Sequence, residues 1–213
     1  MGRDRSGKGS TIPFSVRLVV TIMVLKVDVF GWPREIGEIA MDKKMMVDHE
    51  AFLKGIKPAL YRTYNQGLAE LFPILKEYPH LKDHTGRFLF FQSKEKKQEY
   101  VDNLRQIDLN SPEYHKMLGL LLGYPPKAVD FYVRKCMDRS LSEFSIGLGY
   151  SGVRCVCDVR ELIENTIWLW DTYQLDEELR LMVEGEFIYV SYRNMEELKK
   201  VQASILQRIA VTV

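Results

Sequence analysis

Residues 113–135 (EYHKMLGLLLGYPPKAVDFYVRK) bring together residue types that could bind an anion. Tyr124 and Tyr132 offer aromatic rings with hydroxyl groups at the tip, and Gly123 allows close approach to the backbone. A helix that begins after the Pro-Pro pair would point unpaired N–H groups outward beside Lys127. We therefore expect a binding site for a small anionic ligand or a protein partner, formed by His115, Gly123, Tyr124, Lys127 and Tyr132.

The same segment also fits a helix-turn-helix. Such a pair needs a small residue where the helices cross and a glycine where the chain turns, and Gly119 and Gly123 occupy these places. Basic residues of the second helix would meet DNA phosphates, whereas Asp130 would repel them. This alternative, a DNA-binding protein, rests on Lys127, Arg134 and Lys135.

A plain structural interpretation of the segment stays open beside these two. Its apolar residues recur at helical spacing and would form an ordinary helix–helix core without any ligand. The residues concerned are Leu118, Leu121, Leu122, Val129 and Tyr132.

Residues 115–125 (HKMLGLLLGYP) resemble the H-x-x-L-G-x-x-L-G-Y-P segment of an uncharacterised prokaryotic protein family. The family implies no established activity. Its members often carry cysteines after the proline, where this chain has Pro126, Lys127 and Ala128, so any redox or metal role of those cysteines is lost here. The resemblance covers only this segment and implies at most a structured corner that binds a ligand or a partner.

Three other motifs lack the context that their chemistry requires. Residues 6–10 (SGKGS) look like a phosphate-binding loop, but a strand-like run follows them instead of the helix that such a loop needs. His80 and His84 have metal-ligand spacing, yet neighbouring Pro79 and Gly86 predict a surface loop. The carboxylates at 158, 161 and 164 are typical of a solvated helix face.

No nucleophile elbow and no Cys/His arrangement stands out in the sequence. We therefore predict no catalytic residue, no metal site and no cofactor. A hydrolase or nucleotide-using enzyme, with a site scattered along the chain, is the second alternative function.

The bulk composition narrows the class of protein. The chain has 213 residues and a formal net charge of +1, which argues against a surface that grips nucleic acid as a whole. Three cysteines and no evident signal peptide predict a cytoplasmic protein. The apolar run within residues 16–30 is too short to span a membrane and favours a buried strand, so no membrane partner is expected.

Hydrophobic periodicity predicts the elements that position the 113–135 segment. We expect helices over 48–78, 94–107, 112–135, 160–175 and 195–209. Pro58 and Pro73 should interrupt or kink the first of these, and Gly123 should break the helix over 112–135. Strands are expected at 16–30, at 87–93, within 142–159, and in a hairpin that turns at Glu184-Gly185, with a loop over 78–86.

These patterns predict an α+β protein with a central helical cluster, which includes the helix-turn-helix-like hairpin, and a small, mostly antiparallel sheet. Residues 1–12 are expected to form a flexible tail and residues 13–213 a single domain. The oligomeric state is left open.

Overall fold

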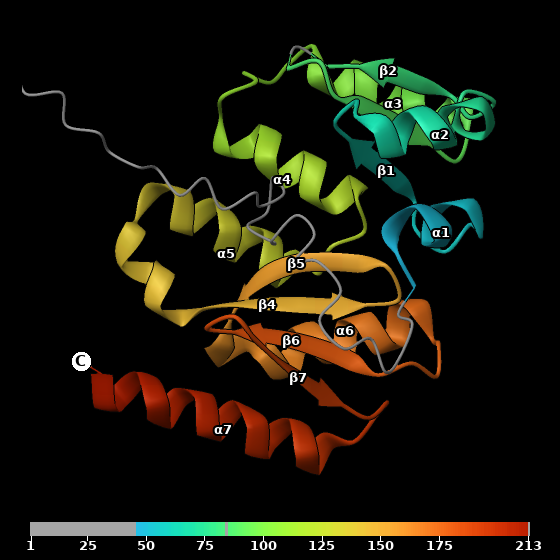
Figure 1. Ribbon diagram of the computed structural model, residues 1–213. Helices are drawn as coiled ribbons and strands as arrows, with labels where there is room; N and C mark the ends of the chain where they lie inside the picture. The colour runs from blue at the N-terminus through green and yellow to red at the C-terminus, as the bar shows by residue number, and fades with distance from the viewer. Residues whose placement is uncertain (1–45, 84, 213) are drawn as a thin grey trace, which may run out of the picture.

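The computed structural model describes residues 46–83 and 85–212. The predicted tail, the strand at 16–30, the loop-like motif at 6–10 and His84 lie outside the described residues. The fold is α+β, with a three-stranded and a four-stranded antiparallel sheet (Figure 1). No helix in the described ranges is long and apolar enough to cross a membrane.

The first part of the chain builds the three-stranded sheet, whose strand order is β1-β3-β2. Its elements are α1 (Asp48–Leu53), β1 (Ala59–Arg62), α2 (Gln66–Leu75), β2 (His80–Lys82), β3 (Phe88–Phe91) and α3 (Lys94–Leu104). Leu60 and Phe90 face α2, where they pack with Leu68 and Leu75. The opposite face joins the main core through Leu89 and Phe91.

Two sequence predictions in this part are wrong. The helix expected over 48–78 is interrupted by β1, which pairs with β3, because a segment of four residues is too short for its periodicity to distinguish a helix from a strand. The loop expected over 78–86 contains β2, which pairs with β3 from His80 to Lys82. The strand predicted at 87–93 is confirmed.

The second part of the chain builds the four-stranded sheet, whose order is β5-β4-β6-β7. Figure 1 shows α6 on one face of this sheet, α5 beside β5, and α4 between α5 and the smaller sheet. The elements are α4 (Pro112–Leu121), α5 (Pro126–Met137), η1 (Arg139–Phe144), β4 (Ser145–Tyr150), β5 (Val153–Asp158), η2 (Val159–Glu161), α6 (Leu162–Tyr173), β6 (Leu179–Val183), β7 (Glu186–Val190) and α7 (Met195–Thr212).

Helix and strand boundaries in this part follow local chemistry that the sequence displays. Ser93 and Ser111 each accept a hydrogen bond from the backbone N–H three residues on, so they cap α3 and α4. The predicted hairpin turn at Glu184-Gly185 and the predicted helix over 195–209, which is α7, are also confirmed. Both turn residues have positive φ, which the glycine adopts without strain.

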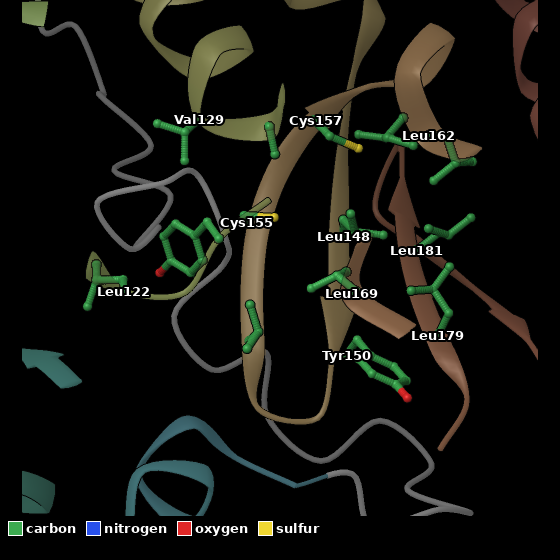
Figure 2. Packing of buried hydrophobic residues seen from close by; sticks show 14 of the residues in the cluster. Leu122, Val129, Leu148, Tyr150, Cys155, Cys157, Leu162, Leu169, Leu179 and Leu181 are labelled. Atoms are coloured by element: carbon green, nitrogen blue, oxygen red, sulfur yellow. The ribbon is translucent and has the colours of Figure 1, made fainter. Parts of the chain in front are cut away.

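The main core lies between the four-stranded sheet and α6, and extends to α4 and α5. Leu148 and Leu181 of the sheet face Leu162 and Leu169 of α6 (Figure 2). Within α6, Ile167 faces outward and is 39% exposed, whereas Leu169 is fully buried. Cys155 and Cys157 form no disulfide, and both are buried within this cluster.

The α4–α5 hairpin depends on two glycines. A Cβ atom at Gly119 would lie 2.8 Å from Cγ2 of Val129, so α4 and α5 cross too closely there for any larger residue. Gly123 has a φ of +77° and ends α4. Its carbonyl oxygen accepts a hydrogen bond of 2.6 Å from the hydroxyl of Tyr173, which ties the turn to α6.

A carboxylate ties the turn between β2 and β3 to β1. The hydroxyl of Tyr61 donates to Asp83, which also accepts from the backbone N–H groups of Thr85 and Arg87. Burial raises the pKa of Asp83, but these hydrogen bonds lower it more, so the pKa lies below its ordinary value. Burial also raises the pKa of Tyr61 to about 12, helped by its bond to Asp83.

We expect Gly119→Ala to destabilise the protein by about 1–3 kcal/mol, because the new methyl group forces α4 and α5 apart. Urea unfolding followed by circular dichroism measures the free energy of unfolding. Gly67→Ala in α2 is the matched control, since its Cβ would meet its nearest neighbour at an ordinary 3.6 Å. Equal stability of Gly119→Ala and wild type would disprove the close crossing.

Asp83→Asn is expected to lower the free energy of unfolding at pH 7 by about 1 kcal/mol, because the amide cannot accept all the hydrogen bonds that the carboxylate accepts. The folded-state pKa of Asp83 is depressed, so its contribution is present above the unfolded-state pKa and is lost as the pH falls through the folded-state pKa. The difference between wild type and variant should therefore shrink below about pH 4. Asp102→Asn, at an exposed pair on α3, is the control, and its effect should be smaller at pH 7.

Candidate functional site

The surface of the α4–α5 hairpin carries an open groove of about 580 Å³. The groove runs between α4 and α5 and reaches the start of α6, so the segment singled out in the sequence forms most of its walls. The lining residues are Pro112, Glu113, Lys116, Lys127, Asp130, Val133, Arg134 and Glu161. We call this feature the hairpin groove.

The sequence of α5 explains why its charged residues face the groove. Ala128, Val129 and Phe131 are buried on the inner side of the helix. Lys127, Asp130 and Arg134 are spaced three and four residues apart, so they form one stripe on the outer side. Burial of the inner face therefore fixes which charges point into the groove.

Each cation of the groove wall is paired with a carboxylate from a neighbouring element. Lys116 of α4 lies 2.8 Å from Asp130, Lys127 lies 3.3 Å from Glu164 of α6, and Arg134 lies 3.7 Å from Glu161. The paired side chains are partly exposed to solvent, so each pair contributes only about 0–1 kcal/mol. The lining itself holds three cations and three carboxylates, the latter being Glu113, Asp130 and Glu161, and is therefore electrically balanced, while Glu164 lies outside it.

Glu161 is the loosest of these partners. Its Oε2 atom is buried, and within the described ranges no donor forms a hydrogen bond with it, since Arg134 is too distant at 3.7 Å. A buried carboxylate oxygen without a donor is unfavourable. The pair between Arg134 and Glu161 is the longest of the three ion pairs.

The five residues predicted to bind a ligand do not line one common space. Lys127 lines the hairpin groove, whereas Gly123 and Tyr124 are buried, with the Nζ of Lys57 lying 5.5 Å from the ring centre of Tyr124. The rings of His115 and Tyr132 pack edge to face, with their centres 5.9 Å apart. Both side chains are half-buried, and neither lines the groove. Lys127 is thus the member of this set that the groove contains.

The residues of the DNA-binding alternative are also divided. Lys127 and Arg134 line the groove, but each faces a carboxylate. Lys135 is half-buried and donates to the hydroxyl of Ser145 at 3.1 Å. Burial lowers the pKa of the Lys135 ammonium group, as expected for a cation removed from water.

Sequence reasoning missed the carboxylates as parts of the site. Glu161 and Glu164 were assigned to a solvated helix face together with Asp158. In the structure Asp158 is buried, at 2% exposure, and is held by Arg160, so that assignment is wrong for Asp158. Burial raises the pKa of Asp158, but the hydrogen bonds from Arg160 lower it by more than burial raises it. The pKa of Asp158 is therefore below its ordinary value.

The part of the chain that the structure describes holds no group of three His, Cys, Asp or Glu residues able to bind a metal. His80 lies on β2 rather than in a loop, and its Nδ1 atom is 2.9 Å from the carbonyl oxygen of Tyr78. Burial raises the pKa of the Cys157 thiol well above its usual value, so this thiol stays protonated and unreactive at neutral pH.

Comparison with known proteins found no matching family model, no matching curated protein and no matching solved structure. The resemblance of residues 115–125 to a prokaryotic family therefore stays a prediction. What the groove can do rests on its own geometry.

The pair between Lys116 and Asp130 predicts a measurable coupling. Lys116→Glu alone and Asp130→Lys alone should each lower the free energy of unfolding, because each places like charges together across the groove. The double variant restores an opposite-charge pair, and we expect a coupling energy of about 0.5 kcal/mol from urea unfolding of all four proteins. Strictly additive effects would show that the two side chains do not interact in solution.

Proposed function

We propose that this chain is a non-catalytic binding protein that takes a protein partner in the hairpin groove. The observation that carries the proposal is the balanced wall of alternating charges, with Lys127, Asp130 and Arg134 on one exposed stripe. Surfaces of this kind give specificity for a partner with the complementary order of charges.

The charge balance favours a protein over a small anion. An anion at Lys127 or Arg134 would compete with Glu164 or Glu161 and would meet their negative charge. Duplex DNA would bring many phosphates to the same carboxylates, at a cost that grows with each contact. A protein segment can offer a base to each carboxylate as well as an acid to each cation.

Apolar side chains beside the charged stripes support the same choice. Leu120, one turn beyond Lys116 on α4, is 43% exposed, and Met137, one turn beyond Arg134 on α5, is 68% exposed. Val133 contributes an apolar patch within the groove itself. Apolar residues bordered by charges are typical of protein contact surfaces, and methionine adapts readily to a partner.

Site-directed photo-crosslinking in the source organism tests the proposal. A photoreactive amino acid at Leu120 should give one discrete covalent adduct, because this exposed position follows the groove residue Lys116 by one turn on the same face of α4. The same amino acid at Ile74 of α2, which is 55% exposed and remote in sequence, is the matched control and should give none.

The adduct must also depend on the groove charges. We expect Arg134→Glu, combined with the photoreactive Leu120 position, to reduce the adduct by about fivefold, which corresponds to a loss of roughly 1 kcal/mol of binding free energy. Circular dichroism verifies that this variant is folded. An adduct that forms equally at Ile74, or that ignores Arg134→Glu, would refute the proposed function.

A further inference from the structure

We infer that residues 16–30 of this chain dock on the outer face of the four-stranded sheet, above Gly147 and Gly149 of β4. The contact is made by the apolar run of residues 18–25 (LVVTIMVL), which lies outside the described residues. This surface is separate from the hairpin groove, so the inference does not depend on the proposed function.

The register of the sheet defines its two faces. Leu148 and Leu181 point toward α6 (Figure 2). Side chains alternate along a strand, so Gly147 and Gly149 belong to the opposite, outer face. Two rows of residues cross the outer face from β5 to β7. The first row is Val156, Gly147, Met182 and Phe187, and the second is Arg154, Gly149, Arg180 and Tyr189.

The two glycines of the outer face are not required by the backbone of β4. They lie in a regular interior strand, and the glycines with positive φ in the described residues are elsewhere. Glycine within a strand weakens the sheet, and it often marks a place where another backbone approaches closely. Gly147 and Gly149 are nevertheless buried. A chain segment packed over β4 accounts for both the residue type and its burial.

Apolar burial on this side exceeds what the described core provides. Val156 and Phe131 are 4% and 0% exposed, yet neither belongs to the two hydrophobic clusters that the described residues form. Phe131 lies one turn before Lys135 on α5. Lys135 in turn donates to Ser145, which precedes Gly147 on the same face of β4. Val156 and Phe131 therefore border the area above the glycines, and their burial calls for an apolar neighbour from outside the described ranges.

The chain enters the described structure beside this face. α1 lies at the β4–β5 turn, where a Cβ atom on Gly152 would be 2.6 Å from the Cβ atom of Ala51. Residues 31–45 could span about 50 Å if fully extended, whereas four strands measure only about 14 Å across. The covalent link thus gives the apolar run an effective concentration on the order of millimolar at the sheet, which favours it over a separate partner.

The composition of the run also suits a buried position. It is apolar except for Thr21 and carries no charge. Exposed to water, such a run costs free energy in proportion to its apolar area and promotes self-association. The outer face offers it the small glycines in the middle, with Val156, Met182 and Phe187 beside them.

Photo-crosslinking within the full-length chain tests the inference. p-Benzoylphenylalanine replaces Met182 in one variant and Phe187 in another. Trypsin then cuts after Arg17 and Lys26, which releases the apolar run within residues 18–26. We expect a covalent link between this peptide and the peptide of residues 181–193. The matched control carries the photoreactive residue at Tyr64, which is 57% exposed and follows β1, and should give no link to residues 18–26.

An equal mixture of isotope-labelled and unlabelled protein identifies which chain supplies the linked peptide. Links confined to peptides of one isotope arise within a single chain and support the inference. Links between the two isotopes would show that a second copy covers this face. No link from either position would show that the run lies elsewhere, and each of these last two results overturns the inference.

Thermal unfolding separates docking from a local need for glycine. Gly149→Val should lower the melting temperature of the intact chain by about 5 °C, because the new side chain occupies the space of the docked run. Ile22→Asp prevents docking, so in that background Gly149→Val should leave the melting temperature unchanged or raise it, since valine favours strands. Thr11→Asp, outside the run, is the control background and should retain the loss.

An equal loss from Gly149→Val in the Ile22→Asp and control backgrounds would show that β4 itself requires glycine, and the inference would fail. Circular dichroism verifies that each variant is folded. Gly149→Ala takes the place of Gly149→Val in all three backgrounds if the valine variant does not fold, and the same contrast between backgrounds is expected at a smaller size.

Discussion

The close crossing of α4 and α5 is the constraint from which the rest of the surface follows. Gly119 offers no Cβ, so the two helix backbones approach until Val129 fills the space above it. The turn at Gly123 closes the hairpin, and Pro58 and the Tyr173 hydroxyl pack against that glycine. With one face of α5 buried in this way, its opposite stripe is fixed in position and direction, and so is the groove beside it.

Much of the local structure could be predicted because its causes are local. Ser93 and Ser111 cap helices with their own hydroxyl groups, and Gly119 and Gly123 mark a crossing and a turn that no other residue type fits as well. The strand β1 could not be predicted, because the conformation of these four residues between two helices depends on a partner strand about thirty residues later. Asp158 was misassigned for a related reason, since its burial depends on where β5 ends.

The sequence predicted the cations of the candidate site but not the carboxylates that pair with them. Lys127 and Arg134 are visible in the sequence as cations on a helix, and that pattern alone favours anions or DNA. Their carboxylate partners come from η2 and α6, which follow only after two strands have intervened. Ion pairs with residues far along the chain thus neutralise the cations of α5. The sequence shows the charged residues, but only the fold shows which of them are paired.

The aromatic residues show the same dependence on the fold. Tyr124 and Tyr132 looked suited to a ligand because each joins an apolar ring to a polar tip. The structure uses Tyr124 inside the hairpin, beneath the ammonium group of Lys57, and sets Tyr132 against His115. These rings therefore pack within the α4–α5 hairpin, while weakly paired charges and a few apolar side chains remain at its surface. A rigid support with exchangeable ion pairs loses little conformational entropy on binding, and this is the physical basis of the partner binding that we propose for the hairpin groove.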